Sequence, residues 1–186
     1  GCYQKGLLKL PESIIVSSLR SQSFLENLGI SSDLMQHASY IDVYVDGVDA
    51  INPQWECLKG MGGAMTGEKL CLHMAKTFIV IYDSQKEVPR LSEDMPLPVE
   101  LVSWARSLFG RMVVSLGGRP ILREKKSELG NDIIDCYGLT YAACYELDKK
   151  IAYMPGVVSH GLFVRRKPDI AIKITGDVVE KKERAS

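Results

Sequence analysis

The sequence lacks the features that mark several classes of protein by composition alone. Lys and Arg together number 23, and Asp and Glu also number 23, so no net charge is available to attract nucleic acid or an anionic membrane. No apolar run approaches the roughly 20 residues that cross a bilayer as a helix. The chain opens with Gly-Cys-Tyr-Gln-Lys, without the apolar segment of a signal peptide. We therefore expect a cytoplasmic protein that has neither nucleic acid nor membrane as its partner.

Metal ligands and paired cysteines are equally scarce. The chain has three histidines and five cysteines, and no two cysteines have a C-x-x-C spacing. An odd number of cysteines without such spacing is typical of reduced thiols in an intracellular protein. No zinc-binding pattern is present either. We expect no metal site and mostly buried, free thiols at Cys2, Cys57, Cys71, Cys136 and Cys144.

Apolar strands alternate with helices in the first half of the chain. The pattern predicts strands at residues 13–17, 41–45 and 78–82, and helices at residues 18–27 and 68–76. Strands that are apolar almost throughout, separated by helices, are typical of a parallel sheet covered on both faces. The chain length of 186 residues suits one domain, or one domain with a small appendage. We therefore expect an α/β fold.

The pattern changes after three prolines between residues 88 and 99. The second half predicts a small α+β unit, because its helices and strands do not alternate strictly. A charged tail at residues 181–186 is expected to fray. The predicted α/β domain comprises residues 1–96 and 170–186, and the small domain comprises residues 97–169. The elements predicted here are a helix at 103–116, a turn at 117–120, strands near 121–123 and 133–137, a helix at 142–154, an extended run at 157–164, and a strand at 170–174 that returns to the first sheet.

The densest cluster of reactive side chains lies between Asp46 and Lys69. Asp46-Gly47-Val48-Asp49 directly follows a predicted strand, where ligands of open α/β sheets bind. Lys59 then opens the glycine-rich loop 60–63, whose amides can approach an oxygen-rich ligand. Each part also has an ordinary explanation. Asp-Gly is common in hairpin turns, and glycines are common in surface loops.

Glu68 falls at the start of a predicted helix, where an acidic residue is favoured by the helix dipole and Thr66 could serve as the N-cap. Beside Lys59 and two aspartates it is also a candidate general base. Its pKa would be set by repulsion from Asp46 and Asp49 against attraction to Lys59. Taken together and in this order, the groups predict an active site.

These segments resemble the type A ribose-5-phosphate isomerases. The family patterns DGADE, KGGGAALTREK and D-x-S-K correspond to DGVDA, KGMGGAMTGEK and DSQK in this chain, with the same spacing. PVEL, GGRP, GN-x-x-x-D and PGVV-x-x-GLF follow in the family's order, so the similarity extends from about Ile14 to Val179. The resemblance implies a Rossmann-like sheet and a small ferredoxin-like domain. It also implies a homodimer or homotetramer with contacts through the small domain.

The resemblance implies interconversion of D-ribose 5-phosphate and D-ribulose 5-phosphate through an enediolate, without metal or organic cofactor. By this analogy Glu68 moves the proton between C1 and C2. Lys59 and the loop amides would stabilise negative charge on oxygen. Asp46 and Asp49 would bind sugar hydroxyls and help to open the ring, and Lys86 would contact the phosphate. The implied substrate-binding residues are Asp46, Gly47, Val48, Asp49, Lys59, Gly60, Met61, Gly62 and Lys86.

Several residues depart from the family pattern. Ala50 replaces the Glu of DGADE, Met61 replaces the second loop glycine, and Gly67 replaces the Arg of TREK. Glu128-Leu129 replaces the usual Asp-Asn. The family also begins with a strand and a loop, followed by a helix whose N-terminus holds the phosphate. The strand and the loop would precede the start of this chain.

Two alternatives to an active isomerase stay open. One is a truncated or degenerate paralogue that binds sugar phosphates without turnover. The other is a sugar-phosphate-sensing domain, although the sequence has no helix-turn-helix segment of the kind that such repressors carry.

Overall fold

The structure, a computed structural model, describes residues 9–91 and 94–184 and divides into two compact units, the second beginning at Tyr40. The first unit contains the helix α1 (Leu19–Asn27) and the parallel strands β1 (Ile15–Val16) and β2 (Asp33–Leu34). The Ser18 side chain accepts a backbone N–H of the first turn and so caps α1. The helix predicted at residues 18–27 is confirmed. A short 3-10 helix, η1 (Met35–His37), follows β2.

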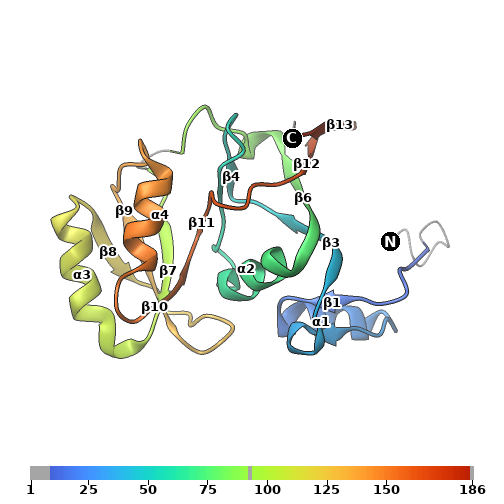
Figure 1. Cartoon of the computed structure of the whole chain (residues 1–186), viewed down its shortest axis with the longest axis horizontal. Coiled ribbons are helices and arrows are strands. Elements are labelled where there is room, and N and C mark those ends of the chain that lie inside the picture. Colours follow the sequence, from blue (N-terminus) through green and yellow to red (C-terminus); the bar gives the residue numbers. More distant parts are fainter. Residues whose placement is uncertain (1–8, 92–93, 185–186) are drawn as a thin grey trace. The chain divides into compact units, whose positions relative to one another are not determined.

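A mostly parallel sheet in the second unit has the strand order β13-β12-β6-β3 (Figure 1). Strands β3, β6 and β12 are mutually parallel, so their carboxyl ends meet at one edge. Strand β13 is antiparallel to β12. The predicted α/β class and the predicted return of residues 170–174 to this sheet are confirmed. The strands are β3 (Ile41–Gly47), β6 (Ala75–Asp83), β12 (Ile170–Thr175) and β13 (Val178–Glu183).

The prediction of a frayed tail from residue 181 was wrong as far as Glu183. Every residue of β13 pairs with a residue of β12, although all of them are exposed. Polar side chains are acceptable on an outer strand because they face water and discourage pairing with another chain. Residues 178–183 therefore form a strand because they pair with β12, and no local apolar pattern in the sequence indicated this pairing.

A ferredoxin-like βαββαβ arrangement forms the second sheet, with the order β10-β7-β9-β8 and only antiparallel pairs. Helices α3 and α4 pack on one face of this sheet (Figure 1). The predicted α+β character is confirmed. Its elements are β7 (Leu97–Leu101), η3 (Ser103–Ala105), α3 (Arg106–Ser115), β8 (Arg119–Leu122), β9 (Asp132–Tyr137), α4 (Cys144–Ala152) and β10 (Val157–His160).

Strand β7 was not predicted, because Pro98 and Glu100 interrupt its apolar pattern. All five of its residues are buried. Leu97, Val99 and Leu101 belong to the core beneath α3 and α4, whereas Glu100 bonds to α2 on the opposite side. The strand is therefore covered on both faces. The predicted turn at residues 117–120 was also too long, because Arg119 and Pro120 already belong to β8.

A short sheet with the order β11-β5-β4 connects residues 46–69, which contain β4 and β5, to the chain after β10. Its strands are β4 (Ala50–Ile51), β5 (Cys57–Leu58) and β11 (Leu162–Phe163). The extended run predicted at residues 157–164 is thus two strands, separated by Gly161. Since residues 40–184 form one compact unit, the predicted domain boundaries near residues 97 and 169 remain a prediction.

Four of the five cysteines lie in the described part of the chain; all four are buried, and Cys57, Cys136 and Cys144 are free thiols. Cys2 lies outside it. Within residues 9–91 and 94–184, no helix is long and apolar enough to cross a membrane. In the same ranges, no group of three or more His, Cys, Asp or Glu side chains is placed to hold a metal ion.

Candidate active site

Asp46, Lys59 and Glu68 meet at the carboxyl end of β3. The β4–β5 hairpin folds the chain back, so that Lys59 lies beside Asp46 at the end of β3, although the two are thirteen residues apart in the sequence. Its Nζ lies 2.8 Å from Asp46 Oδ2 and 3.3 Å from Glu68 Oε2, and it donates to the carbonyl of Gly47. Lys59 is only 3% exposed. The chain does not turn at Asp46-Gly47, since β3 pairs with β6 through Gly47, so the hairpin alternative is wrong.

Glu68 lies in the first turn of α2 (Met65–Met74), which begins three residues earlier than predicted. The N-cap is Ala64, and no side chain caps the helix. Thr66 lies inside the helix and donates its hydroxyl to Glu100, so its predicted role as the N-cap was wrong. The first turn places Glu68 at the positive end of the helix dipole, facing Lys59.

Burial and mutual charge set the protonation of this cluster. Burial raises the pKa of Glu68; the Lys59 ammonium opposes this and Asp46 reinforces it, so that the pKa lies above its ordinary value of 4.5. Burial alone would lower the pKa of Lys59, but the charges of Glu68 and Asp46 outweigh it and raise the pKa. Lys59 is therefore a permanent cation. Glu68 is a stronger base than an exposed carboxylate, which suits proton abstraction.

The glycine-rich loop presents its backbone beside these groups. Asp49 Oδ2 accepts the N–H of Met61 at 3.1 Å, which ties the second predicted aspartate to the loop. Gly60 and Gly63 have φ angles of 103° and 82°, which only glycine adopts readily, and Gly63 N–H donates back to Gly60. Met61 has no positive φ and is 43% exposed, so a side chain is tolerated where the family has glycine.

Val48 and Ala50 are buried directly after the strand end. Val48 can offer only its backbone to a ligand, since its side chain belongs to the core. Ala50 is completely buried in β4, and a glutamate at this position would place a carboxylate in the apolar interior. Alanine at position 50, where the family pattern DGADE has glutamate, therefore fits the apolar packing around β4.

Lys86 lies at the same sheet edge but apart from the cluster. It ends the 3-10 helix η2 (Ser84–Lys86), which directly follows β6 and is capped by the side chain of Asp83. Lys86 is exposed, and within the described ranges its ammonium forms no ion pair. The structure thus leaves this cation available to an incoming anion at the edge where β3 and β6 end.

Tyr44 is a site residue that the sequence reasoning missed. It lies two residues before Asp46 on the same face of β3, and its hydroxyl donates to Asp46 Oδ2. Its ring stacks on Phe78 at 5.3 Å between centroids. Burial, Asp46 and Glu68 all raise the pKa of Tyr44, so the hydroxyl stays a donor. The two-residue alternation in the strand was the available signal.

Arg123, also missed, clamps the glycine-rich loop from the end of β8. Its Nη1 donates to the carbonyls of Gly60 and Met61 at 3.2 and 3.1 Å. The same guanidinium holds both carboxylate oxygens of Asp135. The N–H of Glu128 donates to the carbonyl of Gly63 at 3.1 Å. Arg123 and Glu128, in the segment between β8 and β9, thereby hold three carbonyls of the loop.

Glu100 performs a similar function for α2. Its side chain is 1% exposed and accepts hydrogen bonds from Thr66 Oγ1, Ser127 Oγ and Asn131 Nδ2. The carboxylate therefore joins the first turn of α2 to the segment after β8. No sequence signal pointed to this role, because the contacts span 27 to 34 residues.

Gly161 provides the closest backbone approach in the site. A Cβ at this position would lie 2.1 Å from the carbonyl oxygen of Lys59. The Lys59 N–H donates to the Gly161 carbonyl at 2.9 Å, and the Gly161 N–H donates to Pro98 at 2.8 Å. A residue about one hundred positions away therefore holds the backbone of Lys59 by a hydrogen bond and by close packing.

Comparison with known proteins gives one consistent answer. The family model described as ribose 5-phosphate isomerase A (phosphoriboisomerase A) matches residues 13–176. The chain belongs to this family. A ribose-5-phosphate isomerase A from Haemophilus influenzae is 40% identical over 162 residues, which are 87% of this chain and 74% of that protein.

Solved structures of family members have the same fold. The ribose 5-phosphate isomerase A of Neisseria gonorrhoeae is 32% identical, with a TM-score of 0.89 over 96% of this chain and 80% of that one. A D-ribose-5-phosphate isomerase in complex with phospho-erythronic acid is 28% identical, with a TM-score of 0.87 over 98% of this chain and 82% of that one. The predicted isomerase function is confirmed at the level of the family, and neither alternative receives support.

Proposed function

We propose that this chain interconverts D-ribose 5-phosphate and D-ribulose 5-phosphate with Glu68 as the base. Glu68 removes the proton from C2 of the open-chain aldose and returns it to C1, while the proton on O2 passes to O1. The observation that carries this assignment is the buried Glu68–Lys59 pair at 3.3 Å beside an exposed strand end. A buried carboxylate with a raised pKa has the basicity the step requires, and the adjacent cation offsets charge that develops on the substrate.

The enediolate needs fixed donors at the oxygens on C1 and C2. Lys59 and the loop amides of Gly60 and Gly62 are held before the substrate arrives, since Arg123, Gly161 and the bond from the Met61 amide to Asp49 fix the loop backbone. Preorganised donors of this kind need no rearrangement as charge develops. Lys59 remains charged throughout because its pKa is raised.

Asp46 and Asp49, together with the backbone at Gly47 and Val48, would bind the sugar hydroxyls. Asp46 is oriented by Tyr44 and Lys59, and it stays partly exposed toward the strand end. Lys86 would bind the phosphate as a point charge, because it is exposed at the same sheet edge. A related protein solved with phospho-erythronic acid, a phosphorylated sugar acid, supports a ligand of this class.

A homodimer or homotetramer in the cytoplasm is part of the same proposal. The small sheet region is the proposed place for the contacts between subunits, as the resemblance implies. Sedimentation of the purified chain would give the oligomeric state.

The test is direct formation of ribulose 5-phosphate from ribose 5-phosphate by this chain and by Glu68→Gln. We expect the substitution to lower kcat by about 10²–10⁴-fold, the usual contribution of a general base. Glu180→Gln, at an exposed position of β13, is the matched control and should keep full activity. If the unaltered chain is folded and binds ribose 5-phosphate without turnover, the non-catalytic paralogue replaces this proposal.

A further inference from the structure

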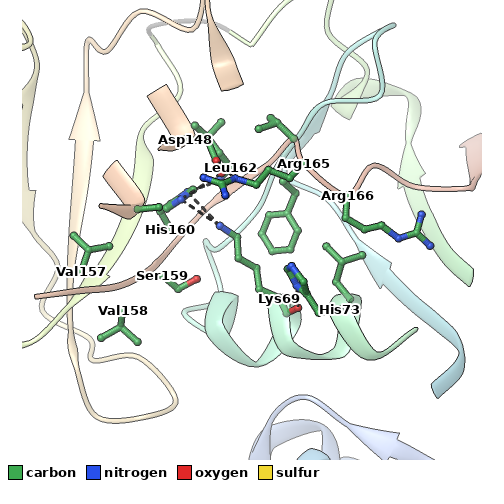
Figure 2. Close-up of a pocket in the computed structure, with 14 residues that line it drawn as sticks. Lys69, His73, Asp148, Val157, Val158, Ser159, His160, Leu162, Arg165 and Arg166 are labelled. Carbon is green, nitrogen blue, oxygen red and sulfur yellow. Dashed lines mark hydrogen bonds and ion pairs between the residues drawn. The ribbon is translucent and has the colours of Figure 1, made fainter. Parts of the chain in front are cut away.

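A cavity of about 210 Å³ shares one wall with the candidate active site. That wall is Phe163, whose ring centroid lies 5.5 Å from Lys59 Nζ and 5.2 Å from Lys69 Nζ. Lys69 directly follows Glu68 in α2 but belongs to the cavity lining, whereas Glu68 does not. Helix α4 and the chain from β10 to Arg166 complete the cavity (Figure 2). Its apolar lining includes Leu72, Val157, Val158, Leu162, Phe163 and Val164.

The Lys69 ammonium lacks a carboxylate partner among residues 9–91 and 94–184. Figure 2 shows it rising from α2 toward His160, where it lies 3.3 and 3.4 Å from the two ring nitrogens. The N–H of Leu162 already donates to His160 Nδ1. An ammonium has three hydrogen-bond donors, so Lys69 retains capacity for a further acceptor. Burial lowers the pKa of Lys69 to about 8, with Asp148 opposing and Arg165 reinforcing the shift.

The carboxylate in the cavity wall is already neutralised. Asp148 Oδ2 accepts from Arg165 Nε at 2.5 Å, and Asp148 Oδ1 lies 3.4 Å from His160 Nε2. Burial, Lys69 and Arg165 lower the pKa of His160 well below its ordinary value, so this histidine is neutral and its contact with Asp148 is not an ion pair. Arg166, also in the lining, pairs with Asp169, so Lys69 is the lining cation without a carboxylate partner among the described residues.

Ser159 gives a second and independent sign of a ligand. The residue is 7% exposed, and its hydroxyl has no hydrogen-bond partner in the described part of the chain. Buried hydroxyls without a partner are rare, because losing water without replacement is unfavourable. In Figure 2 the Ser159 oxygen points to the side on which Lys69 lies, and both residues line the cavity.

We propose that this cavity binds a small carboxylate with a ring-sized apolar body. The carboxylate accepts hydrogen bonds from Lys69 and Ser159, and the apolar part packs against Leu72 and the valines of β10. An apolar cavity of about 150 Å³ is large enough for benzene, so 210 Å³ accommodates one ring with a carboxylate. A single unpaired ammonium matches a monoanion better than a phosphate dianion. The site is separate from the proposed isomerase activity.

Titration with benzoate tests the proposal, with amide chemical shifts to locate the bound molecule. We expect saturable shifts at Lys69, Ser159 and Leu162. Lys69→Met keeps most of the apolar stem and should weaken benzoate binding at least tenfold, because the charge-assisted hydrogen bond is lost. Ser159→Ala should weaken it by about three- to tenfold. Lys149→Met, at an exposed position of α4 outside the cavity, should leave binding unchanged.

Benzyl alcohol, a neutral molecule of the same size, separates charge recognition from simple cavity filling. It should bind the unaltered chain more weakly than benzoate does, and Lys69→Met should remove the difference. Thermal unfolding of each variant confirms that it is folded. The proposal is overturned if benzoate causes no saturable shifts, if folded Lys69→Met binds it equally well, or if inorganic phosphate binds at these residues in preference to benzoate.

Discussion

The two four-stranded sheets of the second unit contribute to the site in different ways. The mostly parallel sheet supplies the charged groups: Asp46 at the end of β3, and Lys59 and Glu68 in the segment that follows. The antiparallel sheet supplies no group to that cluster. It supplies the contacts that hold the cluster in place, through Arg123 and Glu100. Reactive groups and their supports thus come from different parts of the chain.

The difference has a physical reason. A base and a cation act only at the distance and angle the substrate needs, and a loop cannot define these by itself. Glycines make the loop open to a ligand, but they also make it costly to order. The segment between β8 and β9 offsets this flexibility, because it bonds to the loop carbonyls at Gly60, Met61 and Gly63.

Lys59→Met tests the role of the charged groups on the mostly parallel sheet, and we expect it to have the largest effect. We expect kcat to fall by about 10²–10³-fold, the usual loss when one oxyanion donor is removed. Because Lys59 lowers the pKa of Glu68, its removal also raises that pKa, and the acid limb of the remaining activity should move to higher pH. A pH profile of kcat/KM measures this. Lys125→Met is the exposed control, and an unchanged acid limb would contradict the pairing with Glu68.

Gly161→Ala tests whether the β10–β11 junction fixes Lys59. The new Cβ would meet the Lys59 carbonyl at 2.1 Å, so the backbone must shift. We expect about 1–3 kcal/mol of lost stability in urea unfolding, together with lower kcat. Gly62→Ala is the matched stability control, since a Cβ there would meet no atom within 4 Å. Equal stability of the two variants would exclude the close packing described here.

Arg123→Lys tests the clamp from the small sheet. A lysine keeps the charge but cannot bond at once to Asp135 and to two carbonyls, because it lacks the planar fork. We expect kcat to fall about tenfold with little change in KM, measured where the variant is fully folded. Arg119→Lys, an exposed change in β8, which ends next to Arg123, should leave kcat unchanged. If kcat per folded molecule is unchanged and activity falls only with the amount of folded protein, the role of Arg123 is purely structural.

Thr66→Val should give the smallest effect. The change keeps the shape of the side chain but removes one of three hydrogen bonds to the buried Glu100 carboxylate. Loss of one such bond is expected to lower the free energy of unfolding by about 1 kcal/mol. Activity should stay within about twofold, because Ser127 and Asn131 still hold Glu100. If activity falls by more than about twofold, the position of the first turn of α2 depends on the Thr66 hydrogen bond more than expected.

The sequence predicted most of the reactive cluster, because Asp46, Lys59 and Glu68 lie in one strand–loop–helix segment and the order of the groups already suggested their proximity. The same segment misled in detail. Thr66 appeared suited to cap the helix, yet it bonds to Glu100, a partner 34 residues away. Lys69 belonged to no predicted function, although it projects into a cavity.

What the sequence determined by itself was local: apolar strands, the glycine loop, and the acid and cation that follow them. Only the tertiary structure decided that Arg123, Glu100 and Gly161 hold that segment, that β7 and β13 are strands, and that Phe163 lies near two lysines. Contacts of this kind join residues far apart in the chain. These contacts depend on which surfaces meet after folding. A short segment of sequence does not indicate which distant residues it will contact.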